Sequence, residues 1–142
     1  INGRLDAIQA AILLAKLPHF EEEVAMRQEA AQYYSQGLEE VATVPYIEPH
    51  NTSVFAQYTI QVENRDGLKA HLQEKGIPTA IHYPMPLHLQ ECFAYLGYGE
   101  GDFPVAESVS RKVISLPMHP FITREEQDLV IDSILEFHGR SL

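Results

Sequence analysis

The chain has 142 residues, of which 45% are hydrophobic and 21% are charged, a composition typical of an ordinary globular domain with one compact core. Its formal net charge of -10 disfavours nucleic acid and anionic lipid as partners, and no apolar run is long enough to span a membrane. Cys92 is the only cysteine, so no disulfide forms within the chain, and a reducing compartment, the cytoplasm, is the expected location.

The N-terminal stretch predicts an apolar helix that ends near Leu17, because Pro18 lacks a backbone donor. Apolar residues at helical spacing form a face that we expect to be buried: Leu5, Ile8, Ile12 and Ala15. Before this run, Asn2 can donate to a phosphate oxygen, and the guanidinium of Arg4 suits a phosphate or a carboxylate. An ion pair between Arg4 and Asp6 at a helix start explains the same residues, so the pattern alone leaves both interpretations open.

Periodicity and capping residues predict the remaining elements. Helices are expected over 20–40, 66–76, 103–112 and 123–139, and strands over 41–47, 54–62, 77–83 and 113–116, with a helical turn or two over 90–96. Asp66 is the expected N-cap of the second of these helices, and Thr123 with Glu126 forms the capping box of the last. In the clearest strand, 54–62, the even-numbered residues from Ala56 to Val62 share an apolar face.

These elements predict an α+β fold, an α/β sandwich in which a small, largely antiparallel sheet is covered by helices on one side. Long N-terminal helices precede the sheet. We therefore expect two parts, a helical lead-in over residues 1–40 and a small C-terminal α/β domain over 41–142.

A second group of polar residues lies where a predicted strand runs into a proline-rich loop. His82 and Tyr83 offer ring faces and polar tips that could contact a sugar, a uracil or a phosphate. Packing at the edge of the core explains the same two residues, and the sequence alone does not decide between the two interpretations. His82, His88 and Cys92 match no zinc-binding spacing, so no metal is expected.

Several motifs together resemble the C-terminal part of the DegT/DnrJ/EryC1/StrS sugar aminotransferases, which are pyridoxal-phosphate enzymes of fold type I. The motifs are Asn-x-Arg-Leu-Asp at the start, His-Tyr-Pro-x-Pro-Leu-His-Leu-Gln at 82–90, Gly-Asp-Phe-Pro at 101–104 and Ser-Leu-Pro-Met-His-Pro at 115–120. They occur in order over nearly the whole chain. Within the family, the chain is most similar to enzymes that aminate UDP-2-acetamido-2-deoxy-3-oxo-glucuronate.

The resemblance implies a role for each candidate site residue. Asn2 would reach the cofactor phosphate of the neighbouring subunit in a homodimer, and Arg4 would contact substrate there. His82 and Tyr83 would line the sugar-nucleotide side of the site. The parent enzyme would transfer an amino group from glutamate to a keto sugar in the biosynthesis of cell-surface polysaccharide or related amino sugars. Residues 1–40 would be the end of its large domain and a connecting helix.

The chain departs from the family in one respect, because no lysine matches the Schiff-base motif. The lysines are Lys16, Lys69, Lys75 and Lys112. We therefore expect a piece of a longer polypeptide, inactive alone and without a catalytic residue of its own. Two alternatives remain at this stage: a sugar dehydratase of the same family that uses pyridoxal or pyridoxamine phosphate, and a stand-alone ligand-binding or dimerisation module.

Overall fold

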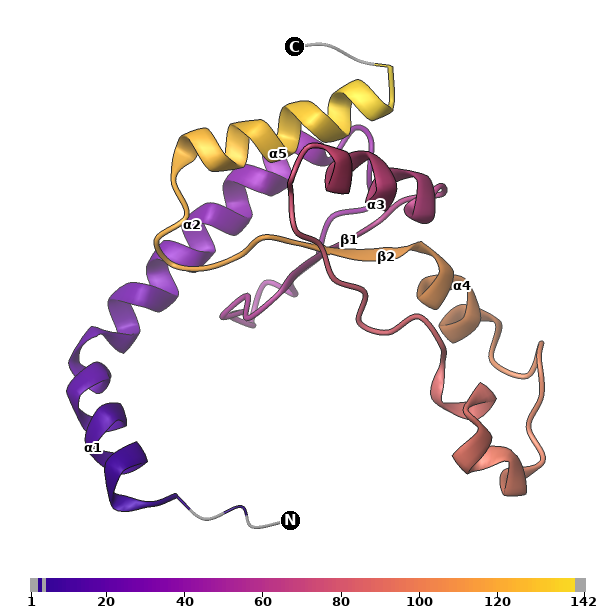
Figure 1. The fold of residues 1–142 in the computed structure, drawn as a ribbon, viewed down its shortest axis with the longest axis horizontal. Coiled ribbons are helices and arrows are strands. Elements are labelled where there is room, and N and C mark those ends of the chain that lie inside the picture. The colour runs from indigo at the N-terminus through magenta and orange to yellow at the C-terminus, as the bar shows by residue number, and fades with distance from the viewer. Residues whose placement is uncertain (1–2, 4, 140–142) are drawn as a thin grey trace.

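Two short antiparallel strands form the centre of the molecule (Figure 1). The computed structural model of the chain describes residue 3 and residues 5–139. Strand β1 (Tyr58–Gln61) pairs with β2 (Val113–Leu116), with Tyr58 opposite Leu116 and Gln61 opposite Val113. Tyr58 and Ile60 are buried on the same face of β1, as the alternation of apolar residues predicts. The helices pack against this face.

Five α-helices and three 3-10 helices occur in the described part of the chain. They are α1 (Ala7–Lys16), η1 (Leu17–His19), α2 (Phe20–Leu38), α3 (Arg65–Glu74), η2 (Leu87–Leu89), η3 (Glu91–Leu96), α4 (Pro104–Lys112) and α5 (Arg124–Phe137). Helices α2, α3 and α5 share one core with the strands, whereas α1 extends away on one side and the segment from η2 to α4 on the other (Figure 1). The chain therefore has the outline of an arch.

An apolar core joins α2, α3, α5 and both strands. Its fully buried large side chains include Tyr34, Leu38, Tyr58, Ile60, Leu68, Leu72, Ile114 and Ile134. The rings of Tyr34 and Tyr58 lie 5.2 Å apart, the Tyr34 hydroxyl donates to the Pro117 carbonyl at 3.2 Å, and Ser35 Oγ lies 2.8 Å from the Tyr58 hydroxyl. Burial of each large apolar side chain contributes roughly 1.5–3 kcal/mol. The strands that border the candidate site are thus anchored in a well-packed core.

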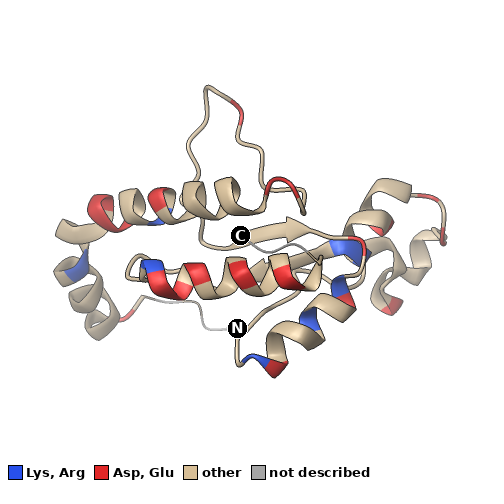
Figure 2. Ribbon diagram, turned by 90° about the horizontal axis from the view of Figure 1, so that it is seen from above, with Lys and Arg blue, Asp and Glu red and all other residues tan. Residues whose placement is uncertain are grey.

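The acidic residues are distributed over the helix surfaces. Figure 2 shows them spaced along α5, and Glu21, Glu22 and Glu23 occupy the first turn of α2, where negative charge is favourable next to the helix dipole. Within the described residues, no helix combines the length and apolarity that a membrane crossing requires.

The predicted fold class and most predicted helices are confirmed. Helix α2 begins at Phe20, α4 begins with Pro104 in its first turn, and α5 begins after the capping box in which Thr123 Oγ1 accepts from Glu126 N at 3.2 Å. Strand β2 covers the predicted residues 113–116. Element order and type follow directly from apolar periodicity and end signals.

The prediction that the first helix buries its apolar face is wrong for the described chain. Helix α1 has the expected bounds and a capping box formed by Asp6 and Gln9, yet none of its residues is buried. Ile8 is 75% exposed and Ile12 is 56% exposed. Periodicity identifies the face that would be covered but not the surface that covers it, and no element of the described chain packs there.

Two strand predictions and one cap prediction are also wrong. Residues 41–47 and 77–83 form no strands and contribute only isolated bridges, Thr43 with Gln61 and Ala80 with Ser115. Pro45 and Pro78 lack the backbone donors that longer ladders need. The N-cap of α3 is Asn64, whose side chain accepts from Gly67 N, and Asp66 lies within the first turn. Both side chains can cap a helix, so spacing alone did not distinguish them.

Candidate functional site

His82 is held at the edge of the strand pair by Ser115 of β2 and by Gln57, which immediately precedes β1. Its Nδ1 lies 3.1 Å from Ser115 Oγ, and Ser115 Oγ lies 2.8 Å from Thr59 Oγ1. On the other side of the ring, Nε2 lies 3.3 Å from Gln57 Nε2. Because Ser115 is buried in β2, the ring orientation of His82 is set by the core rather than by the loop.

Tyr83 is the next residue after His82, and its side chain faces away from the core. Its ring meets that of His82 edge to face, with centroids 5.6 Å apart and planes at 86°. The side chain is 70% exposed. An exposed phenol beside a fixed imidazole can donate to and accept from a ligand while its ring face provides apolar contact.

A cavity of about 450 Å³ begins at these two residues and continues between the following loop and α4. Its lining residues are His82, Tyr83, Met85, Pro86, Leu87, His88, Gln90, Phe103, Ala106, Val109, Ser110 and Val113. Most of them are apolar, and the polar groups are few and separated, which is the usual composition of a small-molecule site. His82 also borders a second cavity of about 300 Å³ that includes Gln57 and Ser115.

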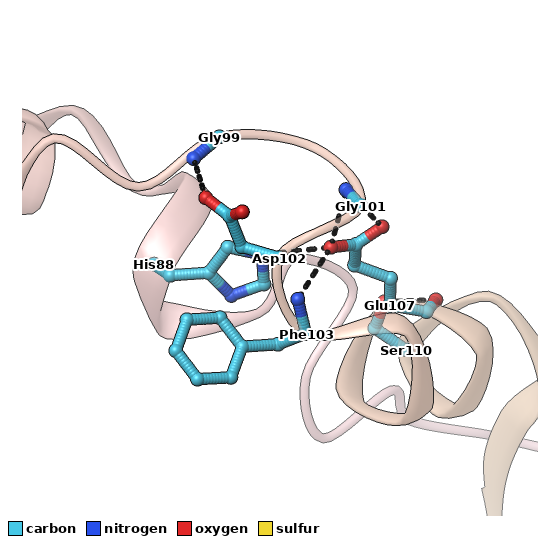
Figure 3. A network of polar contacts seen from close by, with 7 residues as sticks. All are labelled: His88, Gly99, Gly101, Asp102, Phe103, Glu107 and Ser110. Atoms are coloured by element: carbon cyan, nitrogen blue, oxygen red, sulfur yellow. Dashed lines mark hydrogen bonds and ion pairs between the residues drawn. The ribbon is translucent and has the colours of Figure 1, made fainter.

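Glu107 carries a buried carboxylate that binds two residues of the cavity wall, His88 and Phe103. Figure 3 shows the polar contacts around it. Its Oε1 accepts from His88 Nε2 at 3.0 Å, from Gly101 N at 2.9 Å and from Phe103 N at 3.2 Å, and Oε2 accepts from Gly101 N at 3.1 Å. The rings of His88 and Phe103 lie 4.7 Å apart. Glu107 therefore connects α4 with η2 and with the turn before α4.

The surroundings of Glu107 lower its pKa. Burial on its own works to raise the pKa of this carboxyl, but the hydrogen bonds from Gly101 N, His88 and Phe103 N outweigh that effect and hold the pKa below the usual 4.5. The carboxylate is therefore charged in the folded protein at neutral pH. It acts as an acceptor in this network and not as an acid.

The structure brings two of the four predicted site residues together. His82 and Tyr83 line one cavity, whereas Asn2 and Arg4 lie outside the described residues. Two of the lysines form ion pairs, Lys75 with Glu136 and Lys112 with Glu63, each at 2.6 Å. Among residues 3 and 5–139, no group of three or more His, Cys, Asp or Glu side chains is placed to hold a metal ion.

The residues that orient this site were not predicted as site residues. Gln57 and Thr59 lie in the predicted strand 54–62, on the face opposite its apolar residues, and Ser115 lies in the predicted strand 113–116 and in the family motif at 115–120. A lone hydroxyl inside an apolar strand was the available signal for Ser115, because a buried hydroxyl requires a partner. Glu107 lies in the first turn of α4, where an acidic side chain is favourable, and this explains its contact with the Phe103 amide four positions earlier. Its contact with His88, nineteen positions earlier, left no signal in the sequence.

Comparison with known proteins places this geometry in a family. The sequence pattern of the DegT/DnrJ/EryC1/StrS aminotransferase family matches residues 1–135. A crystal structure of a DegT DnrJ EryC1 StrS aminotransferase from Brucella abortus superposes with a TM-score of 0.91 at 47% identity, over 99% of this chain and 38% of that one. The predicted resemblance to this family is confirmed.

Two relatives match the chain at more than 40% sequence identity. A UDP-2-acetamido-2-deoxy-3-oxo-D-glucuronate aminotransferase from Pseudomonas aeruginosa is 46% identical over 123 residues, which cover 86% of this chain and 33% of the relative. A pleiotropic regulatory protein from Geobacillus stearothermophilus is 44% identical over 141 residues, 96% of this chain and 38% of the relative. The chain thus spans little more than a third of the length of its relatives.

Proposed function

Since the chain belongs to the DegT/DnrJ/EryC1/StrS aminotransferase family, we propose that it is the C-terminal part of a pyridoxal-phosphate-dependent nucleotide-sugar aminotransferase. The intact enzyme transfers an amino group from glutamate to a keto sugar. The observation that carries this proposal is the match of the family pattern to residues 1–135, with His82 and Tyr83 side by side at the mouth of a cavity.

The proposed substrate is a nucleotide-linked 3-oxo sugar. The name of the Pseudomonas aeruginosa relative supports this class, as does the chemistry of the cavity mouth. The imidazole of His82 and the exposed phenol of Tyr83 can bind sugar hydroxyls or a diphosphate, while the apolar wall behind them excludes water. Arg4 contributes a guanidinium to the same substrate, and Asn2 contributes an amide to the cofactor phosphate of the partner subunit in a homodimer.

The described residues do not fit the cofactor by themselves. The cavity wall is largely apolar, and Lys75 and Lys112 are engaged in ion pairs on the surface. Pyridoxal phosphate, when bound, supplies an electron sink for the transfer of the amino group. In this proposal the rest of the enzyme holds the cofactor, and the present chain binds and orients the sugar nucleotide.

The remaining assignments follow from the same proposal. Residues 1–40 form the end of the large domain and a connecting helix, and residues 41–142 form the small domain, onto which the C-terminal half of α2 packs. The enzyme acts in the cytoplasm, in the biosynthesis of polysaccharide or related amino sugars.

The proposal is tested with the intact enzyme, glutamate and a panel of UDP- and dTDP-linked keto sugars. Formation of 2-oxoglutarate with equimolar amino sugar supports it, and release of water without amino transfer identifies a dehydratase instead. The Arg4→Ala variant should raise the KM for the sugar nucleotide about tenfold or more and leave the circular dichroism spectrum unchanged. Cofactor-loaded enzyme that aminates no member of the panel contradicts the proposal.

A further inference from the structure

The segment from Pro84 to Phe103 is held by polar contacts rather than by the core. None of its residues is buried, and Leu87 and Tyr95 are 68% and 79% exposed. Apolar burial therefore contributes little to its position. Yet this segment supplies half of the cavity wall, including Met85, Leu87 and Phe103. Polar contacts must therefore hold the segment 84–103 against α4.

Glu107 provides this connection. Its side chain is buried, with 4% of the residue exposed, and one carboxylate binds both ends of the segment: His88 near the beginning, and the Gly101 and Phe103 amides at the end (Figure 3). Hydrogen bonds to a charged acceptor contribute more than neutral ones, particularly away from water. The contacts thus join two places in the segment to one residue of α4.

The residues that Glu107 binds are themselves part of the cavity. His88 and Phe103 both line it, and their rings lie 4.7 Å apart. The opposite end of α4 is fixed as well, because Arg65 Nη1 donates to the Ser110 and Val113 carbonyls at 3.3 Å each. Helix α4 is therefore a fixed support, and the position of the loop relative to it determines the width of the cavity.

We propose that Glu107 is a positioning residue for substrate binding. Its carboxylate holds the segment 84–103 against α4 through His88, Gly101 and Phe103, and thereby shapes the cavity next to His82 and Tyr83. Glu107 does not touch the substrate. The predicted effect on the KM for the sugar nucleotide rests on the proposed function, whereas the predicted effect on the loop does not.

The Glu107→Gln variant tests the proposal in the intact enzyme. Glutamine keeps the size of the side chain but removes the charge, and its amide group cannot accept from two backbone amides and from His88 at once. Amide hydrogen exchange at Gly101 and Phe103 should accelerate about tenfold, while exchange in β1 and β2 stays unchanged. The KM for the sugar nucleotide should rise about tenfold with little change in kcat.

Asp102→Asn is the matched control, because the Asp102 carboxylate lies in the same turn but accepts from Gly99 N at 2.8 Å instead of from α4. It should leave the KM within about twofold of the parent value. In the double variant with His88→Gln, amide exchange at Gly101 and Phe103 should be no faster than in Glu107→Gln alone, since both changes break the same connection between α4 and the loop.

Three results would overturn the proposal: unchanged exchange at Gly101 and Phe103, an equal acceleration throughout β1 and β2, or a tenfold KM effect in the control as well. Loop exchange that accelerates without any change in KM would also overturn it. An inactive parent enzyme would contradict the proposed function alone, because the exchange measurement still decides whether Glu107 fixes the loop.

Discussion

Ser115 and His82 are joined across the edge of the strand pair, with Ser115 Oγ 3.1 Å from His82 Nδ1. Ser115 is buried in β2, and its hydroxyl also lies 2.8 Å from Thr59 Oγ1 in β1. The Ser115 hydroxyl therefore connects both strands to His82, which lines the cavity. A residue of the core thus controls the orientation of a residue at the surface.

Removal of this hydroxyl is expected to affect substrate binding more than folding. Ser115→Ala frees the His82 ring, so the KM of the intact enzyme for the sugar nucleotide should rise about fivefold. The free energy of unfolding should fall by about 1 kcal/mol. Steady-state kinetics and urea unfolding measure the two effects.

The control for this substitution is Ser133→Ala in α5, where a buried hydroxyl donates to the Leu129 carbonyl at 2.6 Å, far from the cavity. It should cost a similar free energy of unfolding and leave the KM unchanged. Equal KM effects in both variants would contradict a role of Ser115 in orienting His82.

Acid should destabilise the chain partly through Glu107. Its pKa in the folded state lies below the usual 4.5, so the unfolded chain binds the proton more readily. The stabilisation is therefore present above pH 4.5 and disappears as the pH falls through the folded-state pKa. Urea midpoints measured from about pH 6 down to about pH 3 should decline less steeply in Glu107→Gln than in the parent.

Glu136 provides a second test of the same kind. Its hydrogen bond and charge interaction with Lys75 lower its pKa below 4.5, and the pair lies on the surface. In Lys75→Met, the free energy of unfolding should therefore fall slightly less steeply as the pH is lowered than in the parent. Added salt should reduce this difference between variant and parent. A difference that persists in about 1 M salt would contradict a charge effect.

A charge in the core should prevent folding. Leu116 in β2 is 4% exposed, and Leu116→Asp places a carboxylate where no partner is available, at a cost of several kcal/mol. Leu129→Asp is the matched control, because Leu129 is 53% exposed on α5. Thermal melts followed by circular dichroism should show loss of the transition in the first variant and a nearly unchanged transition in the second.

Arg65 should be more important for stability than an ordinary arginine. Its side chain is 9% exposed and donates to the carbonyls of Ser110 and Val113, between α4 and β2. Arg65→Met keeps the apolar stem but leaves both carbonyls without this donor, so the free energy of unfolding should fall by about 2–3 kcal/mol. Arg111→Met, at an exposed position of α4, should change it by less than about 0.5 kcal/mol.

Much of the fold could be predicted because its signals are local. The alternation around Tyr58 and Ile60 predicts a strand over 54–62, of which only Tyr58–Gln61 form β1, and the capping box of Thr123 and Glu126 predicts the start of α5. His82 and Tyr83 were predicted as a pair because they follow each other in sequence at a strand end. Such features depend on residues that are neighbours along the chain.

Features that depend on distant residues could not be predicted. Residues 77–83 read as a strand, but only Ala80 pairs, because the flanking prolines and the partner strand decide its length. Glu107 binds groups four, six and nineteen positions away, and no periodicity encodes that arrangement. The roles of Asn2 and Arg4 remain predictions, since both residues lie outside the described part of the chain.

The uncovered apolar face of α1 affects how this chain behaves in a test tube. The large apolar side chains of α1 and of the residues next to it are more than half exposed: Leu5, Ile8, Ile12, Leu13, Leu14, Leu17 and Phe20. Exposed apolar surface of this extent promotes aggregation in water. Produced by itself, the 142-residue polypeptide should therefore precipitate readily, and a version that starts at Glu21 should stay in solution at higher concentration.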